Sequence, residues 1–271
     1  MKKLALFAIL LKISTGIYAQ SGQFARVNGV EIYYEIHGEG EPLVLLHYYE
    51  GSHTAWDPWV DSLAQEYRLI IPDLRGHGNS FNPHETFTHQ AAAKDIYALL
   101  DTLEIDKFKA MGMSSGGMTL LHMAISDSTR ITSMVLIGAT TYFPEPARKI
   151  MSTFQYETED PEYLEYLHSI HSEGEAQIRK LKQEFRDMAH SYRDMNFTAP
   201  YLAQIKCPTL IIHGDRDEYF PINIPVEAYQ AIPNASLWII PNGGHLPNLN
   251  PLWSDSILKI SKLFLVGDLE E

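Results

Sequence analysis

Apolar runs recur along the chain in a pattern that predicts eight strands. Two alternating runs, residues 24–27 and 30–37, flank Asn28-Gly29, a dipeptide typical of the tight turn in a β-hairpin. The other runs are almost continuously apolar, which is typical of strands covered on both faces by helices. They span residues 43–47, 67–71, 108–113, 131–138, 209–213 and 236–240.

Segments with helical spacing of apolar side chains lie between these strands. The clearest begins after Thr88, a residue type that caps helices. Its apolar face carries Ala92, Ile96, Leu99, Leu100 and Leu103. Other helices are expected at residues 55–65, at 224–231 and in the last stretch of the chain, where one helical face carries Trp253, Ile257, Ile260 and Phe264. This alternation predicts an α/β fold: a mostly parallel eight-stranded sheet with helices on both faces.

The alternation stops between residues 141 and 200. No buried strand is expected there, and residues 161–170 and 175–192 have helical spacing. We predict a helical cap, inserted into a core made of residues 20–140 and 201–271. Aromatic side chains of the cap either line a pocket or attach the cap to the core; the candidates are Phe143, Phe154, Tyr156, Tyr163, Tyr166 and Tyr192.

Residues 1–19 have the pattern of a signal peptide. Lys2 and Lys3 form a basic start, residues 4–11 are an apolar stretch too short to span a bilayer, and Ala19 ends a stretch suited to cleavage. We predict export to the periplasm or the medium after cleavage near Ala19. An N-terminal strand or anchor helix is the alternative. No later stretch is apolar enough to predict a membrane span.

The composition and net charge of the chain exclude some classes of binding partner. The 271 residues are 45% apolar, which suits one domain with a substantial core. Removal of residues 1–19 removes three lysines and no acidic residue, so the net charge falls from −13 to −16. Such a charge repels nucleic acids and anionic membranes. Cys207 is the only cysteine, so no intramolecular disulfide is possible, and we expect it in the core.

The stretch most informative about chemistry is Gly-Met-Ser-Ser-Gly-Gly, residues 112–117. It lies between an apolar strand and an apolar helix, as in a sharp turn that lifts a serine hydroxyl out of a sheet. Glycines are needed there because side chains would clash where strand and helix cross. Ser114 is the candidate nucleophile. Ser115 lies outside the central position of the turn, and we expect its backbone N–H to donate to an oxyanion.

A serine needs a base, and the base needs an acid to orient it. His245 follows the last predicted strand, at the sheet edge where α/β folds place their sites. A surface histidine is the alternative, and the competing histidines are His47, His77 and His213. Asp217 is the candidate acid, with Asp215 as its rival. The chain order Ser, Asp, His is that of a nucleophile-elbow hydrolase.

These motifs together resemble the serine hydrolases of the α/β-hydrolase fold, in the compact form with a helical cap. The residues that carry the resemblance are 45–47, 73–80, 112–117, 213–217 and 243–245. The resemblance implies a triad of Ser114, Asp217 and His245, and it favours Asp217 over Asp215.

The loop after residues 43–47 departs from the family pattern. Tyr48 stands where relatives usually have glycine, and the N–H of Tyr49 is the candidate second oxyanion donor. Tyr48 either projects into the pocket, where its hydroxyl serves the substrate or the oxyanion, or packs against the cap. Tyr48 and Met113 are our candidates for pocket residues.

The expected chemistry is two-step acyl transfer on a small-to-medium carboxylic ester. Ser114 attacks the carbonyl, His245 moves the proton, and water releases the acyl group. Lactone opening, carbon–carbon bond hydrolysis and peptide cleavage stay open as alternatives, as does a non-catalytic ligand-binding protein on the same fold. This chemistry requires no metal and no cofactor, and the histidines show no metal-ligand spacing. The sequence leaves the oligomeric state open.

Overall fold

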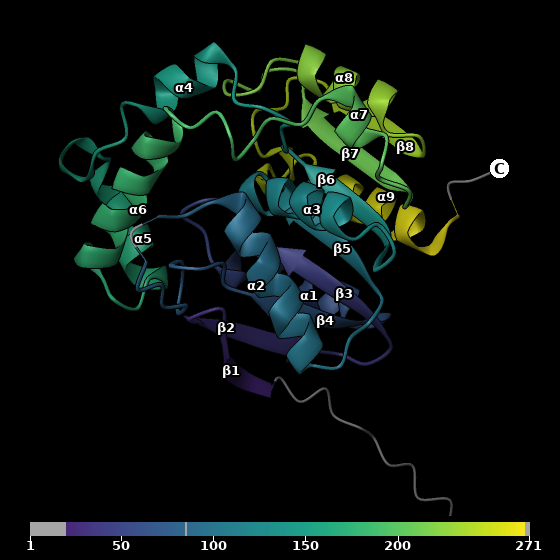
Figure 1. The fold of residues 1–271 in the computed structure, drawn as a ribbon, viewed down its shortest axis with the longest axis horizontal. Helices are drawn as coiled ribbons and strands as arrows, with labels where there is room; N and C mark the ends of the chain where they lie inside the picture. The colour runs from purple at the N-terminus through teal and green to yellow at the C-terminus, as the bar shows by residue number, and fades with distance from the viewer. Residues whose placement is uncertain (1–19, 85, 269–271) are drawn as a thin grey trace, which may run out of the picture.

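The computed structural model describes residues 20–84 and 86–268; the predicted signal peptide lies outside them. Eight strands form one sheet in the order β1-β2-β4-β3-β5-β6-β7-β8 (Figure 1). The β1–β2 and β2–β4 pairs are antiparallel and all the other pairs are parallel, which confirms the predicted fold class. The strands are β1 (Gln20–Val27), β2 (Val30–His37), β3 (Glu41–Leu46), β4 (Tyr67–Pro72), β5 (Phe108–Met113), β6 (Ile131–Ile137), β7 (Thr209–Gly214) and β8 (Ala235–Ile240).

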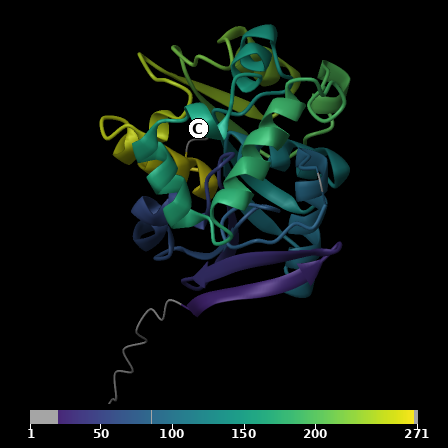
Figure 2. The ribbon, with the colours of Figure 1, turned by 90° about the vertical axis from the view of Figure 1, so that its left-hand side faces the viewer.

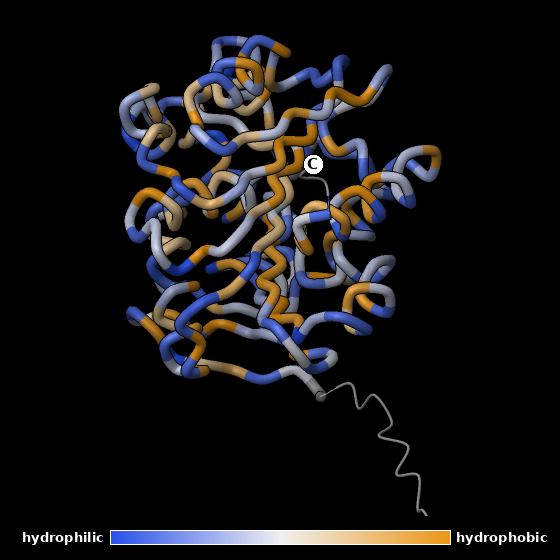
Figure 3. The backbone as a smooth tube through the Cα atoms, turned by 90° about the vertical axis from the view of Figure 1, so that its right-hand side faces the viewer, coloured by the Kyte–Doolittle hydropathy of each residue, from blue (hydrophilic) through white to orange (hydrophobic). Residues whose placement is uncertain are grey.

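Helices cover both faces of the sheet, as predicted. On one face lie α2 (His89–Thr102), α3 (Ser115–Ser126) and α8 (Asn223–Ala231). On the other lie α1 (Asp57–Leu63) and α9 (Ser254–Val266). A band of apolar positions runs through the middle of the molecule, between the two helical layers (Figure 3).

The pleat of the strands decides which helices each side chain meets. Successive side chains on a strand point to opposite faces. In β3, Leu43 and Leu45 therefore join the cluster under α1 and α9, whereas Val44 and Leu46 join the cluster under α2 and α3. Every one of these four side chains is fully buried.

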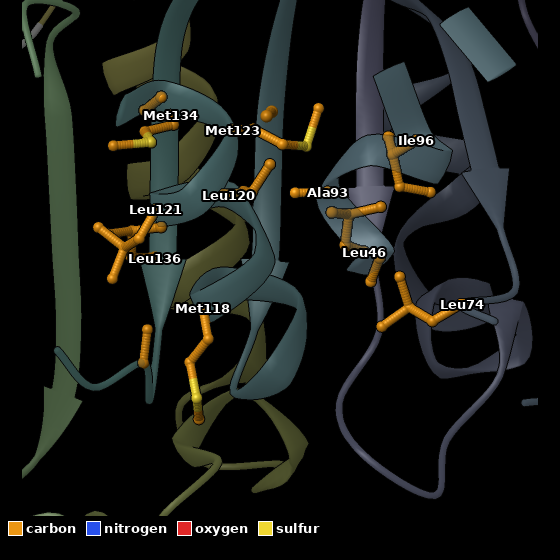
Figure 4. Close-up of a cluster of buried hydrophobic side chains, with 14 of the residues drawn as sticks. Leu46, Leu74, Ala93, Ile96, Met118, Leu120, Leu121, Met123, Met134 and Leu136 are labelled. Carbon is orange, nitrogen blue, oxygen red and sulfur yellow. The ribbon is translucent and has the colours of Figure 1, made fainter. Parts of the chain in front are cut away.

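Helix α3 is held firmly against the sheet, and its position matters for the site. Leu120 and Met123 are fully buried, and Leu121 lies beside Leu136 of β6 (Figure 4). Burial of each such side chain stabilises the fold by about 1.5–3 kcal/mol. The N-terminus of α3, which follows β5 directly, is therefore fixed relative to the edge of the sheet.

Residues 141–200, which we call the insertion, leave the sheet after β6, and most of them lie beyond the carboxyl ends of the parallel strands (Figures 1 and 2). They contain α4 (Glu145–Met151), α5 (Pro161–Ile170) and α6 (Glu175–Met188). The bounds of α5 are as predicted, but α6 ends before the predicted residue 192. The predicted limit at residue 200 falls inside α7 (Ala199–Leu202). Within residues 20–84 and 86–268, no helix is both long enough and apolar enough to cross a bilayer.

Candidate active site

Ser114 sits on a strained turn between β5 and α3. Its φ of 47° and ψ of −112° are rare for a residue with a side chain, and its N–H donates to the carbonyl of Ile137 at 2.8 Å. The flanking glycines are needed for close approach. A Cβ on Gly116 would lie 2.1 Å from the Leu46 carbonyl oxygen, and one on Gly112 would lie 2.5 Å from a backbone nitrogen of α3.

Three side chains that are distant in the sequence form a hydrogen-bonded chain. Ser114 Oγ lies 2.9 Å from His245 Nε2, and His245 Nδ1 lies 2.8 Å from Asp217 Oδ2. Because a carboxylate can only accept, Nδ1 carries the proton and Nε2 of the neutral ring accepts from the serine hydroxyl. This arrangement allows the imidazole to take the serine proton during attack on a carbonyl.

Asp217 is held as a carboxylate in a buried position. Its Oδ1 accepts from the N–H groups of Tyr219 and Phe220 at 2.8 and 3.0 Å. Burial on its own would raise the pKa of Asp217, but His245 and the Phe220 N–H outweigh it, so this pKa lies below its ordinary value. The rival Asp215 instead lies 3.9 Å from Arg216, whereas it is Asp217 that contacts His245. The geometry thus favours Asp217 over Asp215.

His47 shapes the loop that faces the turn of Ser114. Its Nδ1 donates to the Tyr48 carbonyl at 2.7 Å, and its Nε2 accepts from the Leu74 N–H at 2.9 Å. Burial lowers the pKa of His47 to about 4, so the ring stays neutral and keeps this tautomer. The Tyr48 carbonyl also accepts from the Gly51 N–H at 3.0 Å, which closes a tight turn.

The two tyrosines of this loop line a cavity and also bind the insertion. The Tyr48 hydroxyl lies 3.0 Å from the Tyr166 hydroxyl of α5, and the Tyr49 hydroxyl donates to the Leu181 carbonyl of α6 at 2.8 Å. Tyr48 therefore lines the cavity, as predicted, and also packs against the insertion through its hydroxyl. Ser115 also lines the cavity, and its N–H, at the first position of α3, has no acceptor within the helix.

The expectation that Met113 lines the pocket is wrong. Met113 follows Met111 by two residues on β5, so the pleat turns both toward α1 and α9. There Met113 is buried, and its sulfur accepts from the Asn248 side chain at 3.3 Å. The methionines that do line the cavity are Met118, one turn into α3, and Met151 of α4.

The cavity above Ser114 has a volume of about 360 Å³, and Ser114 and His245 open into it. Of the insertion aromatics that the sequence proposed, Phe143, Phe154 and Tyr163 line it. Tyr156 instead contacts His168, and Tyr192 is exposed. Several further lining residues were not predicted from the sequence: Met151, Phe185, Tyr219, Phe220, Leu246 and Leu249.

Acidic side chains lie in the wall of this cavity. Glu50 and Glu159 both line it, and the buried ammonium of Lys182 contacts both, at 3.0 and 2.5 Å. Burial raises the pKa of Glu50 above its ordinary value, although Lys182 acts in the opposite direction. Among the described residues that line the cavity, none is Lys or Arg. The wall therefore offers no cation to a bound anion.

A second Ser–His–Asp set lies directly beside the first. His89 Nε2 is 3.1 Å from Ser115 Oγ, and His89 Nδ1 is 2.6 Å from Asp194 Oδ2. His89 and Ser115 both line the cavity, and all three side chains are buried. The sequence reasoning missed His89 and Asp194, because they are 105 residues apart and carry no local motif.

In the part of the chain that the structure describes, no group of three or more His, Cys, Asp or Glu residues has the geometry to hold a metal ion.

A parallel sheet with a serine on a strained strand-to-helix turn, and a histidine on the loop after the last strand, defines the class of nucleophile-elbow hydrolases. The model of the family described as "alpha/beta hydrolase fold" matches residues 41–170 and 171–251. The chain belongs to this family, and it is a hydrolase. The resemblance seen in its motifs is thereby confirmed.

Several relatives illustrate the chemistry of the family. The chain is 27% identical over 254 residues to 2-hydroxy-6-oxo-2,4-heptadienoate hydrolase of Pseudomonas putida, covering 85% of this chain and 92% of that protein. It is 28% identical over 254 residues to human serine hydrolase BPHL, covering 88% and 84%. The crystal structure of an enol-lactonase from Burkholderia xenovorans LB400 matches with a TM-score of 0.73 and 26% identity, covering 90% and 100%.

Proposed function

We propose that this protein is a serine hydrolase that cleaves a small-to-medium carboxylic ester through an acyl-enzyme. The observation that carries the proposal is the chain from Ser114 Oγ to His245 and on to Asp217, with distances of 2.9 and 2.8 Å, at the floor of a cavity. Ser114 attacks, His245 accepts its proton, and Asp217 stabilises the charged imidazole. The N–H groups of Ser115 and Tyr49 bind the oxyanion.

Labelling and turnover test this assignment directly. A fluorophosphonate probe should label Ser114, as located by mass spectrometry, and the protein should hydrolyse p-nitrophenyl butyrate with a burst of p-nitrophenol. A folded protein that neither labels nor hydrolyses esters would favour a ligand-binding role. Preferred turnover of lactones or peptides over open-chain esters would move the assignment to those classes.

The cavity also supports a preference for substrates without a negative charge. Its volume of about 360 Å³ is near the lower end for ligand pockets, its walls are mostly apolar, and its acidic residues are Glu50 and Glu159. Lys182 neutralises one of these two carboxylates, so one negative charge remains when both are ionised. A substrate carboxylate about 6 Å from that remaining charge would be disfavoured by about 3 kcal/mol at an effective dielectric of 20. A dienoate, the substrate class named for the Pseudomonas putida relative, carries such a carboxylate.

A matched pair of esters tests this preference. The kcat/KM for p-nitrophenyl butyrate should exceed that for mono-p-nitrophenyl succinate, of equal chain length, by roughly tenfold to a hundredfold. Glu159→Gln should narrow the gap. Glu157→Gln is the control, because Glu157 is 64% exposed and pairs with Arg179. Equal rates for the two esters, or rapid hydrolysis of a heptadienoate, would reverse the substrate assignment.

We also propose that residues 1–19 are a cleaved signal peptide and that the mature protein is exported. The basic start, the short apolar stretch and Ala19 support this. The full chain, expressed with its own N-terminus, should yield an exported protein whose mass and N-terminal sequence begin near residue 20. Recovery of the intact chain inside the cell would contradict export.

A further inference from the structure

The second Ser–His–Asp set joins the insertion to the turn that carries Ser114. Asp194 belongs to the insertion, His89 is the first residue of α2, and Ser115 is the first residue of α3. The links are 2.6 Å from Asp194 to His89 and 3.1 Å from His89 to Ser115. Since all three side chains are buried, solvent does not compete with these hydrogen bonds.

The direction of the hydrogen bonds follows from the acid. The Asp194 carboxylate accepts from Nδ1–H of His89, and it also accepts from the backbone N–H groups of His89 and Gln90 at 2.9 and 3.2 Å. In the neutral ring, Nε2 of His89 is then an acceptor, so the Ser115 hydroxyl donates to it. The group that Ser115 can still offer to a substrate is its backbone N–H.

This attachment matters because the turn is strained. Ser114 has a φ of 47°, a conformation that persists only where the surroundings hold it. On one side, the Ser114 N–H is fixed to the Ile137 carbonyl at 2.8 Å. On the other side, the Ser115 hydroxyl is fixed to His89. The two attachments fix the turn on both sides of the reactive hydroxyl.

We propose that His89 and Asp194 are positioning residues that act through the Ser115 hydroxyl to hold the Ser115 N–H, and with it the turn of Ser114, in the geometry that binds an oxyanion. The insertion thereby contributes to oxyanion binding through Asp194 as well as to the cavity wall. This inference rests on the proposed role of Ser114 as nucleophile. It makes Ser115 unsuited to attack, because its hydroxyl is directed toward α2.

A double-mutant cycle between Ser115→Ala and His89→Asn tests the proposal. The Asn amide can still donate to Asp194 in the place of Nδ1, but it cannot reach Ser115. Each single variant should lower kcat for p-nitrophenyl butyrate roughly tenfold, less than the loss of an oxyanion donor, with KM changed less than about twofold. The double variant should also lose roughly tenfold, because both changes remove the same link.

Two results would overturn the proposal. The first is a kcat of Ser115→Ala equal to that of the wild type. The second is a His89→Asn change that lowers kcat as much in the Ser115→Ala background as it does in the wild type. The second result would mean that His89 acts only in the packing of α2. If His89→Asn fails to fold, as judged by circular dichroism, Asp194→Asn takes its place in the cycle with the same expectations.

The same double-mutant cycle can be measured without turnover, from the rate at which a fluorophosphonate labels Ser114. The phosphoryl oxygen of the probe must also be bound by the oxyanion donors, so this rate reports on them. If the wild type labels but hydrolyses no ester, the proposed function fails while the cycle remains readable. Additive losses in labelling would reject the positioning role whatever the substrate.

Discussion

Two Ser–His–Asp sets stand side by side in this protein, and their distances are nearly alike. In the first set, Ser114 to His245 is 2.9 Å and His245 to Asp217 is 2.8 Å. In the second set, Ser115 to His89 is 3.1 Å and His89 to Asp194 is 2.6 Å. Residue types and distances alone therefore do not distinguish the two serines.

The positions of the two sets in the fold do distinguish them. Ser114 occupies the strained turn itself, and His245 comes from the loop after β8, at the carboxyl edge of the sheet. Ser115 is already part of a helix, and its partners come from the start of α2 and from the insertion. A nucleophile needs a hydroxyl at the tip of the turn that opens into the substrate cavity, beside its base and free oxyanion donors. Ser114 meets this condition, whereas the hydroxyl of Ser115 is held by His89.

The largest expected contrast is between the two serines. Ser114→Ala should lower kcat for p-nitrophenyl butyrate roughly 10⁴-fold or more, because the acyl-enzyme cannot form. Ser115→Ala should retain about a tenth of the wild-type rate. Steady-state kinetics on both variants, with burst measurements, check this. A comparable loss in both would make the sets equivalent and would contradict the assignment.

The two acids should differ almost as strongly in activity. Asp217→Asn should lower kcat by about 10³–10⁴-fold, because the amide favours the wrong tautomer of His245. Asp194→Asn should cost at most about tenfold, since His89 accepts no proton in the reaction. The comparison is made at saturating substrate. A larger loss for Asp194→Asn than for Asp217→Asn would assign the base to His89.

The carboxylate of Asp194 should contribute clearly to the free energy of unfolding. Burial on its own would raise its pKa, but His89 and the N–H groups of His89 and Gln90 lower it to about 2, from an ordinary 3.8. A lowered folded-state pKa stabilises the protein above the unfolded pKa, and the gain is lost as the pH falls from about 4 toward 2. Asp194→Asn should lower the free energy of unfolding by about 2 kcal/mol at pH 7.

About half of that difference should remain at pH 3, where part of the linked stabilisation of the wild type is already lost. Urea unfolding of wild type and variant at pH 7 and pH 3 measures it. A difference that stays constant with pH would show that Asp194 stabilises the fold without its charge.

The smallest effect on kcat is expected for Thr88→Ala, a variant that distinguishes the stability of α2 from the positioning of Ser115. The Thr88 hydroxyl caps α2 by accepting from the Ala91 N–H at 3.0 Å, and it contacts neither serine. Thr88→Ala should lower the stability by about 1 kcal/mol and leave kcat within about twofold. Thermal unfolding and kinetics are measured on the same preparation. If kcat falls tenfold, fraying of α2 alone would account for the effect of His89 variants.

Much of the fold could be predicted because its signals are local. The run of residues 108–113 matches β5, and Thr88 caps α2 as its residue type suggests. The triad candidates could be found because each follows a predicted strand, and the carboxyl ends of parallel strands meet at one edge. The error at Met113 came from ignoring the pleat, which places it on the same face as Met111.

By itself, the sequence determined the succession of strands and helices along the chain, the turn at Ser114 and the chain order Ser, Asp, His. These features could be predicted because the spacing of apolar residues, the spacing of glycines and the residue types of turns are properties of neighbouring residues. Tertiary structure decided which groups from distant segments meet. It brought Asp194 to His89 and Lys182 to Glu50 and Glu159, and it directed the Tyr48 hydroxyl to Tyr166. These contacts depend on how the insertion packs over the sheet, and side-chain packing between distant segments has no sequence period.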